Sequence, residues 1–389
     1  MEAYIVAGYR SAVGKAKKGG FKNYRTDDLA VDVIKHLASQ VPELDTTKVD
    51  DVIVGCANPE GEQGLQVARL ISARALGKEV PGVTINRYCA SGLEAISMAV
   101  SKVRAGFGDI FIAGGIESMS LIPMTGYKLA PSYKANLENM NYHIGMGHTA
   151  EAVAERYKIT REASDKFSCE SHIKAANAID NGYFKDEIVP ITVEEVFVKD
   201  GKKVSKSHTV DMDEGVRRET TIEALSKLRP AFKLGGIVTA GSSSQMSDGA
   251  AFVLVMSEDM VKQLGVKPIA RMVTCTSGGV DPLYMGIGPV EAIPKALKQA
   301  GLKLSDIEQT ELNEAFAAQA LAVIQESGLD PDTVNVNGGA IALGHPLGCT
   351  GAKLSIQLLN EMKRRNQKYG MVTACVGGGQ GIAGIYERL

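Results

Sequence analysis

The repeated order of short apolar segments constrains the fold of this chain more than any other sequence feature. Several of these segments read as buried strands that run into a turn and then into residues with helical spacing. They lie in a similar order early and late in the chain, at residues 51–56, 83–85 and 110–115 and again at 307–313, 335–339 and 371–379. Strands that alternate with helices favour an α/β fold with a mostly parallel sheet. The repetition predicts two copies of one fold with a shared site between them.

A region of different character separates the two copies. From about Ser118 to Asp248 the sequence is more polar, with predicted helices at Thr149–Tyr157 and Arg161–Asn181 and a charged hairpin near Val193–Val204. We interpret this region as an insertion, because loops on a rigid scaffold commonly carry binding residues. The predicted organisation is an N-terminal half at residues 1–117 and 249–267, a loop domain at 118–248 and a C-terminal half at 268–389.

Composition excludes several classes of function. The chain has 389 residues with 43 basic and 45 acidic side chains, a balance that gives no general reason to expect nucleic-acid or membrane binding. It has no run of about 18 apolar residues, and its N-terminus lacks the basic start and long apolar core of a signal peptide. The six cysteines are scattered, without the paired spacing of a zinc site or a disulfide framework. These features predict a reduced, cytoplasmic chain without a metal site.

Cys89 is the first candidate for chemistry. A predicted strand ends at Val83–Ile85 and helical spacing begins at Leu93, so Cys89 lies at a strand-to-helix turn. Free backbone N–H groups at a helix N-terminus favour negative charge, and the thiolate is the nucleophilic form of cysteine. We therefore expect this thiol to ionise easily. The alternative is an inert buried cysteine, since free cysteines are among the most buried residues.

Three C-terminal segments supply an amide, an imidazole and a second thiol, each beside glycines or a turn. Taken singly, Asn313 is equally well explained as a turn cap, His345 as a hydrogen-bonded loop residue and Cys375 as a core filler. Together, one per repeat element, they indicate a site. The segments are Asn313-Glu314-Ala315-Phe316, Gly344-His345-Pro346-Leu347-Gly348-Cys349-Thr350-Gly351 and Cys375-Val376-Gly377-Gly378-Gly379-Gln380-Gly381. No P-loop spacing and no dinucleotide-binding Gly-x-Gly-x-x-Gly after the first strand is present.

With Asn86-Arg87-Tyr88-Cys89-Ala90-Ser91-Gly92, these segments resemble the four signature blocks of the thiolase family. The resemblance extends over essentially the whole chain. It implies a thiolase-like α/β fold, with two related halves stacked as a five-layer α-β-α-β-α core and an inserted loop domain. It also implies a homo-oligomer, either a dimer or a dimer of dimers. A multienzyme partner for β-oxidation is compatible with the resemblance, although no residue identifies one.

The resemblance also implies a role for each site residue. His345 takes the proton of Cys89, and the Cys89 thiolate attacks the 3-keto carbon of a 3-ketoacyl-CoA. Cys375 protonates the departing acetyl-CoA enolate and then deprotonates the incoming CoA thiol. One oxyanion site consists of His345 with a water held by Asn313, and another of the backbone N–H groups of Cys89 and Gly377.

Substrate binding is assigned to four further residues by the same resemblance. Arg217 would meet the adenine end of CoA and Ser244 its pantetheine, whereas Met146 and Met285 would line the acyl and pantetheine tunnel. For Arg217 the alternative is a solvated surface charge. CoA and acyl-CoA thioesters are substrates, and no metal or bound organic cofactor is implied.

One departure from the family pattern bears on the subtype. Biosynthetic acetoacetyl-CoA thiolases usually carry His-Met-Gly in the loop domain, whereas this chain has Gly145-Met146-Gly147. Without that histidine the pocket has room for a longer acyl chain, which favours a degradative 3-ketoacyl-CoA thiolase of β-oxidation. The alternative is an acetyl-CoA acetyltransferase that makes acetoacetyl-CoA, because the nearby His143 and His148 are able to replace the group in part.

Two other classes fit less well. A decarboxylating ketoacyl synthase of the same superfamily needs a histidine or an asparagine where Cys375 stands. A thiolase-like binding protein without activity predicts a broken signature, whereas all four blocks are intact. We also expect Cys89 and Cys375 to face each other across the substrate site, where oxidation would join them in a disulfide if their Cα atoms lie within about 7 Å.

Overall fold

The computed structural model describes all 389 residues. Its central strands follow the order β11-β12-β13-β10-β1-β9-β5-β3-β4, with two short strands, β2 and β6, paired to the side. The strands are β1 (Ala3–Ser11), β2 (Gly14–Lys15), β3 (Asp51–Cys56), β4 (Gly82–Ile85), β5 (Ile110–Ser118), β6 (Ile188–Val189), β9 (Ser247–Ser257), β10 (Ala270–Gly279), β11 (Gln309–Leu312), β12 (Tyr369–Val376) and β13 (Gln380–Arg388).

The two ends of this strand order repeat one another. In the N-terminal half β4, β3 and β5 are parallel, and β9 and β1 continue the sheet antiparallel. In the C-terminal half β11 and β12 are parallel, and β13 and β10 continue antiparallel. The halves join where β1 meets β10, at the single backbone pair Ile5 and Ala270. The predicted repeat of strand order is confirmed.

One repeat element differs from its counterpart. Residues 335–339 form no strand, and only Val334 bridges Thr310 in parallel, where β4 pairs with β3 over four positions. Asn335 explains the difference, because its backbone has a left-handed φ of 46° and leaves the extended conformation. Its side-chain amide instead accepts from the N–H of Leu312 and donates to the carbonyl of Leu312, both at 2.8 Å. The side-chain amide of Asn335 thus takes the place of the backbone hydrogen bonds that a strand would form with β11.

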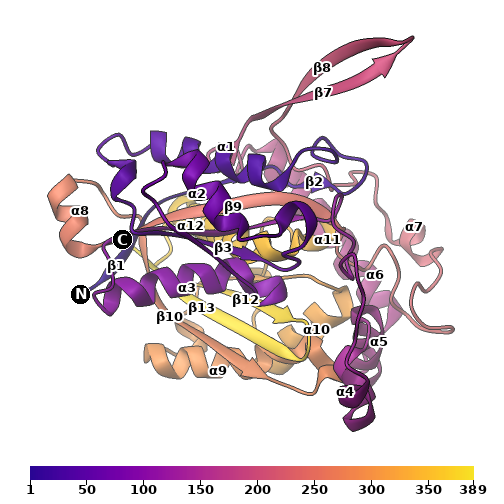
Figure 1. The fold of residues 1–389 in the computed structure, drawn as a ribbon. Coiled ribbons are helices and arrows are strands. Elements are labelled where there is room, and N and C mark those ends of the chain that lie inside the picture. Colours follow the sequence, from indigo (N-terminus) through magenta and orange to yellow (C-terminus); the bar gives the residue numbers. More distant parts are fainter.

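Five layers follow from the two-residue period of the strands (Figure 1). In β9, Phe252 and Leu254 face an outer cluster with α1 and α2, whereas Val253 and Val255 face the middle layer. The middle layer consists of α3 and α12, and α9 and α10 cover the outer face of the C-terminal sheet. These helices are α1 (Thr26–Ser39), α2 (Val67–Ala75), α3 (Ser91–Arg104), α9 (Gly288–Ala300), α10 (Ala317–Ser327) and α12 (Leu347–Arg365). The predicted α-β-α-β-α core is confirmed.

Glycines bring α3 and α12 into close contact at the N-terminal ends of both helices. A Cβ atom added to Gly351 would lie 2.3 Å from the backbone nitrogen of Leu93, and one added to Gly92 would lie 2.7 Å from that of Ala352. Only glycine allows backbones to approach this closely. The turn before α3 and the loop before α12 are therefore held side by side.

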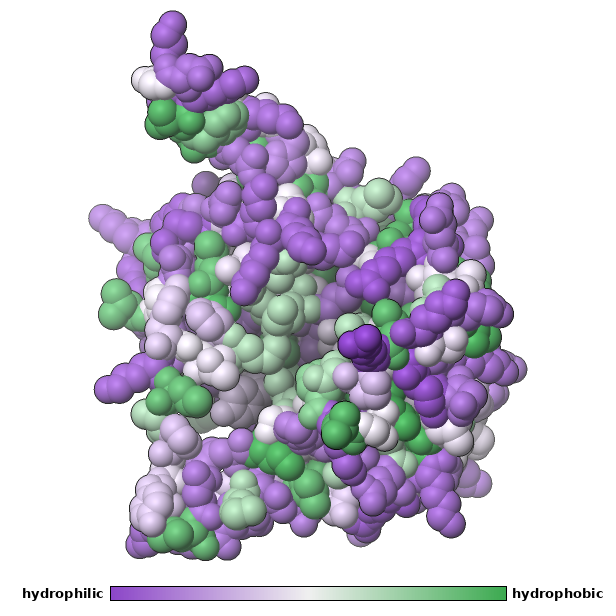
Figure 2. Space-filling view, turned by 90° about the vertical axis from the view of Figure 1, so that its right-hand side faces the viewer, coloured by the Kyte–Doolittle hydropathy of each residue, from purple (hydrophilic) through white to green (hydrophobic).

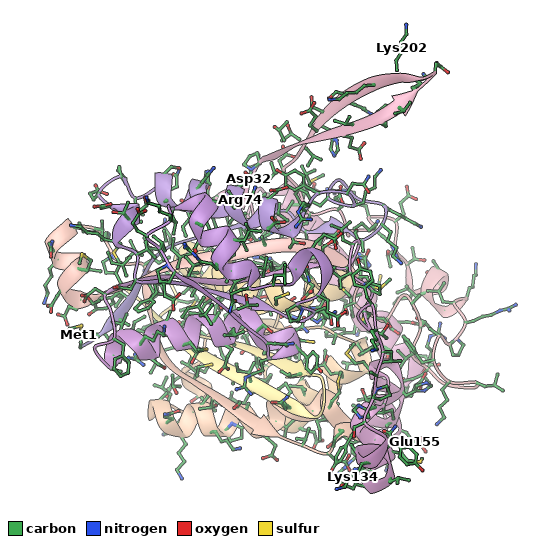
Figure 3. All side chains as sticks on the ribbon, in the orientation of Figure 1. Met1, Asp32, Arg74, Lys134, Glu155 and Lys202 are labelled. Carbon is green, nitrogen blue, oxygen red and sulfur yellow. The ribbon has the colours of Figure 1, made fainter.

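The region between β5 and β9 leaves the sheet after Ser118 and returns opposite it, at Asp248. It contains α4 (Tyr133–Glu138), α5 (Met146–Arg156), α6 (Arg161–Asp180), α7 (Ile222–Ser226) and the hairpin of β7 (Ile191–Lys199) and β8 (Lys202–Val210); outside it lie two further short helices, α8 (Glu258–Leu264) and α11 (Ala340–Leu343). The predicted helices and hairpin are confirmed, with the hairpin longer than expected. The hairpin projects from the core with Lys202 at its tip (Figure 3).

Apolar surface gathers along the middle of the face that carries α4 to α7, between hydrophilic regions (Figure 2). A buried ion cluster anchors the region behind this face to the core. Arg10 of β1 binds both carboxylate oxygens of Asp213 at 2.7 and 2.9 Å and Glu187 at 2.7 Å. No helix in the structure has both the length and the apolar character needed to cross a bilayer.

Candidate active site

Cys89 lies in a short 3-10 turn, Tyr88–Ala90, between β4 and α3. Tyr88 has a φ of 43°, which is uncommon for a residue with a side chain and marks local backbone strain. Two side chains fix the turn. Asn86 Oδ1 accepts from the N–H of Tyr88 at 2.7 Å, and Ser91 Oγ accepts from the N–H of Arg87 and donates to the Tyr88 carbonyl. The predicted strand-to-helix turn is confirmed.

The ionisation of Cys89 differs from the expectation. Burial raises the pKa of this thiol to about 12, although the backbone N–H groups of Gly377 and of Cys89 itself favour the thiolate. The expectation of an easily ionised thiol is wrong, because Cys89 is 2% exposed and loses more hydration than the backbone groups replace. A base is therefore needed to remove the proton.

His345 is a neutral base in this structure. Burial, and to a smaller degree the charge of Lys353, lowers the pKa of His345 to about 3. Thr350 Oγ1 donates to the Pro346 carbonyl at 2.9 Å and lies 2.5 Å from His345 Nδ1. A hydroxyl has one proton, so Nδ1 carries the proton of the ring and donates to Thr350. Nε2 is then unprotonated and accepts from Asn313 Nδ2 at 3.2 Å.

Asn313 is held in place by its backbone and by the carboxylate beside it. Its backbone N–H donates to the Thr373 carbonyl at 2.9 Å. Its side-chain Oδ1 is buried and has no hydrogen-bond partner. The adjacent Glu314 accepts from Ser171 of α6 and from Asn335, at 2.7 and 2.8 Å. Glu314 thus fixes the Asn313 segment against both the loop region and the C-terminal half.

Cys375 lies near the end of β12 and is fully buried. Its thiol is close enough to Cys89 for the charge of one to disfavour ionisation of the other, and burial raises its pKa well above the usual value. The chain then turns through Gly378 and Gly379, with φ of 79° and 83°, conformations that favour glycine. This turn places the N–H of Gly377 at Cys89. The structure therefore places Cys89, Gly377 and Cys375 together, and it places His345 against Asn313, whose backbone bonds to β12 two residues before Cys375.

Three of the four predicted substrate-binding residues lie beside this centre. Met285 is buried in one cluster with Cys375, and Met146 packs at the edge of that cluster. The N–H of Ser244 donates to the Ala315 carbonyl at 2.9 Å, two residues after Asn313. Arg217 is exposed on the loop after β8, where its guanidinium has no hydrogen bond or ion pair within the chain.

Two positioning groups escaped the sequence analysis. Thr350 is one, and Glu117 at the end of β5 is the other. Glu117 accepts from the N–H groups of Ala57 and Gly348 at 2.8 and 2.9 Å and from Gln63 Nε2 at 2.7 Å, and burial raises its pKa. It connects the end of β3 to the start of α12. An acid directly after a run of apolar residues and glycines was the available signal.

No group of three or more His, Cys, Asp or Glu side chains in the chain has the geometry to hold a metal ion. A fold of two related α/β halves that enclose two thiols, an imidazole and an amide defines a thiolase. The comparisons agree: the thiolase N-terminal domain model matches residues 3–259, and the C-terminal domain model matches residues 266–388. The chain belongs to the thiolase family.

Individual relatives cover the whole chain. It is 52% identical to the 3-ketoacyl-CoA thiolase of Bacillus subtilis (strain 168), over 99% of both chains. It is 43% identical to the 3-oxoadipyl-CoA/3-oxo-5,6-dehydrosuberyl-CoA thiolase of Escherichia coli (strain K12), over 100% of both. Among solved structures, the Bacillus anthracis acetyl-CoA acetyltransferase matches with a TM-score of 0.90 at 39% identity, over 100% of this chain and 99% of that one.

Proposed function

We propose that this protein is a degradative thiolase, which cleaves a 3-ketoacyl-CoA with CoA to acetyl-CoA and a shortened acyl-CoA. The observation that carries the proposal is the juxtaposition of the Cys89 thiol with the N–H of Gly377 and the thiol of Cys375. A relative named 3-ketoacyl-CoA thiolase at 52% identity supports the choice of substrate.

The first half-reaction uses His345 as base. Its unprotonated Nε2 accepts the proton of Cys89, and the sulfur attacks the 3-keto carbon. The Nε2–H so formed donates to the developing oxyanion, together with a water for which the free Oδ1 of Asn313 is a suitable acceptor. The carbon–carbon bond breaks, the acyl group remains on Cys89, and acetyl-CoA leaves as an enolate that Cys375 protonates.

The second half-reaction reverses the role of Cys375. Its thiolate, now without the proton given to the enolate, takes the proton of an incoming CoA thiol. The CoA sulfur attacks the acyl-Cys89 thioester, and the N–H groups of Cys89 and Gly377 stabilise the oxyanion. Cys89 leaves as a thiolate and takes back the proton from His345 Nε2, and the shortened acyl-CoA departs. CoA is a substrate here, and no other cofactor takes part.

The loop domain, residues 118–248, would hold CoA on the face of Figure 2. We assign Ser244 to the pantetheine, Arg217 to the adenine end, and Met146 and Met285 to the acyl and pantetheine tunnel. The position of the two methionines against Cys375 supports this assignment. The free guanidinium of Arg217 supports it as well, since an exposed arginine without a partner is available to a phosphate or a base.

The second candidate function is that of an acetyl-CoA acetyltransferase, which is the activity named for the solved Bacillus anthracis structure. The two candidates differ in the acyl chain length of the substrate. The Gly145 position has no side chain, and both His143 and His148 are exposed. Neither histidine therefore crowds the buried cluster around Cys375. This favours a pocket that accepts acyl chains longer than that of acetoacetyl-CoA.

The test measures CoA-dependent cleavage of 3-ketoacyl-CoA substrates from four to about sixteen carbons. Wild type should act across the range, and Cys89→Ala should be inactive on all. Gly145→His is the matched variant, because Gly145 has a φ of −67° and a Cβ there meets its nearest side-chain atom at 3.6 Å, an ordinary contact. It should shift preference toward four carbons. Wild-type activity on the four-carbon substrate alone would identify an acetyltransferase instead.

Assembly and location complete the proposal. We infer a dimer or a dimer of dimers, which the free edge of β4 at the end of the strand order supports. Sedimentation of the full chain measures it. We infer a cytoplasmic location, because the reaction needs Cys89 and Cys375 as thiols and a reducing compartment maintains them. All six cysteines are free in the structure. Copurification tests whether the protein binds a multienzyme partner for β-oxidation.

A further inference from the structure

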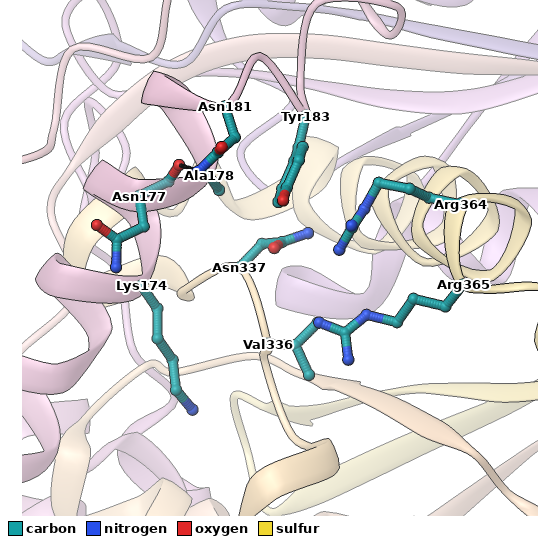
Figure 4. Close-up of a pocket in the computed structure, with 9 residues that line it drawn as sticks. All are labelled: Lys174, Asn177, Ala178, Asn181, Tyr183, Val336, Asn337, Arg364 and Arg365. Atoms are coloured by element: carbon teal, nitrogen blue, oxygen red, sulfur yellow. Dashed lines mark hydrogen bonds between the residues drawn. The ribbon is translucent and has the colours of Figure 1, made fainter.

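A cavity lies between the C-terminal end of α6, the segment before α11 and the C-terminal end of α12 (Figure 4). Its volume is about 410 Å³, and none of its lining residues belongs to the catalytic centre or to the predicted substrate-binding set. The lining residues are Lys174, Asn177, Ala178, Asn181, Tyr183, Val336, Asn337, Arg364 and Arg365.

The charge around this cavity is not balanced. Lys174, Arg364 and Arg365 line it. The acid that hydrogen-bonds to the two arginines is the buried Glu361, which binds Arg364 Nε at 2.8 Å and Arg365 Nε at 2.5 Å. Asn337 Nδ2 donates to the same carboxylate at 2.9 Å. Three cations face one hydrogen-bonded carboxylate, and the buried Glu314 also acts on Lys174, which leaves net positive charge at the opening.

Several donors at the cavity have no partner within the chain. Lys174 Nζ makes one long contact, 3.4 Å to the Val334 carbonyl, and the terminal NH1 and NH2 groups of Arg365 make none. The Tyr183 ring lies under the Arg364 guanidinium, 3.8 Å from its centroid, which holds that arginine in place. In Figure 4 the side chains of Lys174 and Arg365 approach the Val336–Asn337 segment from opposite sides. These donors line one cavity from separate elements.

The cavity is remote from the proposed reaction. The α12 helix has 19 residues; His345 lies two residues before its first residue, Leu347, and its last turn contains Arg364 and Arg365. At 1.5 Å per residue this helix separates the two places by about 28 Å. The reacting end of a CoA molecule at the catalytic centre therefore lies far from this cavity.

We propose that this cavity binds the phosphate group of a small phosphorylated molecule. A phosphate monoester carries close to two negative charges near neutral pH, which complements the net positive charge at the opening. Its tetrahedral oxygens suit donors that arrive from different directions, as Lys174 and Arg365 do, and arginine forms charge-assisted bonds with phosphate. The apolar parts of Ala178 and Val336 complete the wall for the organic part of the ligand.

The experiment follows the thermal unfolding midpoint of the full-length protein against inorganic phosphate, with sodium chloride added to hold ionic strength constant. It is carried out with and without saturating CoA, which occupies the proposed substrate site. The variants are Lys174→Gln and Arg365→Gln. Lys363→Gln is the matched control, because Lys363 is exposed on the same helix end and does not line the cavity. Glu361 keeps Arg364 and Asn337 as partners in Arg365→Gln.

We expect saturable stabilisation that persists with CoA present. Each of Lys174→Gln and Arg365→Gln should raise the half-saturating phosphate concentration about tenfold, as loss of one charge-assisted contact does, and Lys363→Gln should leave it unchanged. Three results would overturn the proposal: stabilisation without saturation, equal stabilisation in all four proteins, or stabilisation that CoA abolishes. The last would place phosphate at the substrate site. Isothermal titration of the wild-type protein with phosphate, with and without CoA, measures the same binding without unfolding the protein.

Discussion

Replacement of Thr350 by valine tests how the protein prepares its base. Valine keeps the branched shape of threonine and removes only the hydroxyl, so that His345 Nδ1 loses the oxygen 2.5 Å away. The backbone N–H of residue 350 still donates to the Pro346 carbonyl at 2.9 Å, so the first turn of α12 keeps this hydrogen bond. The ring is then free to carry its proton on Nε2, where it is unable to accept the proton of Cys89.

The size of the effect follows from the burial of His345. A buried donor left without a partner costs about 1–3 kcal/mol, and this is the free energy by which Nδ1 protonation becomes less favourable. It corresponds to a decrease of about 5- to 150-fold in the rate at which iodoacetamide alkylates Cys89 at neutral pH. Two-bond proton–nitrogen correlation spectra of nitrogen-15-labelled histidine identify the protonated nitrogen directly.

Thr350→Ser is the control, because it restores the hydroxyl without the methyl group. It should return the alkylation rate and the Nδ1-protonated spectrum close to wild type. If Thr350→Val retains the Nδ1 proton and alkylates within twofold of wild type, Thr350 does not set the tautomer and the reasoning fails. A valine variant that alkylates slowly but keeps the wild-type spectrum would also contradict it.

Three further predictions concern acid stability, the buried ion cluster and oxidation. His345 stays neutral in the folded chain down to about pH 3 but binds a proton near pH 6.5 when unfolded, so stability falls as pH falls between these values. Urea denaturation at pH 7 and pH 5 should show wild type losing about 2 kcal/mol more than His345→Asn, and equal losses would refute this. Arg10→Met should lower the unfolding free energy by about 3–5 kcal/mol, because it leaves the buried Asp213 unpaired; a loss below about 1 kcal/mol would count against it. Mild peroxide should inactivate the enzyme through a Cys89–Cys375 disulfide visible by mass spectrometry, and a loss of activity that no reductant reverses would exclude it.

Most of the fold could be predicted from the sequence, because the strands of the core are buried on both faces and read as short apolar runs. The run at residues 110–115 became the larger part of β5, and the repeated order gave the two halves. Residues 335–339 could not be interpreted in this way. Asn335 has a left-handed backbone conformation, and its side chain is hydrogen-bonded to the backbone of Leu312. Both features are favourable only in the context of the surrounding structure.

The residues of the candidate site could be selected from the sequence, but their protonation states could not. Glycines beside Cys89, His345 and Cys375 mark places where backbone approaches closely. The pKa of Cys89 depends instead on burial by segments far away in the chain, which a local pattern does not contain. The bonds of Glu117 to residues 60 and 231 positions away in sequence are long-range for the same reason.

The distances between the proposed catalytic residues depend on how the two halves of the protein pack against each other. Cys89 belongs to one half and His345 and Cys375 to the other, yet the sheets share the single backbone pair Ile5 and Ala270. The spacing between nucleophile and base is therefore set by how closely α3 and α12 pack, and dense interiors transmit a displacement with little loss. A methyl group added at Gly351 would push α3 and α12 apart. It would change the distance between Cys89 and His345 without altering either side chain.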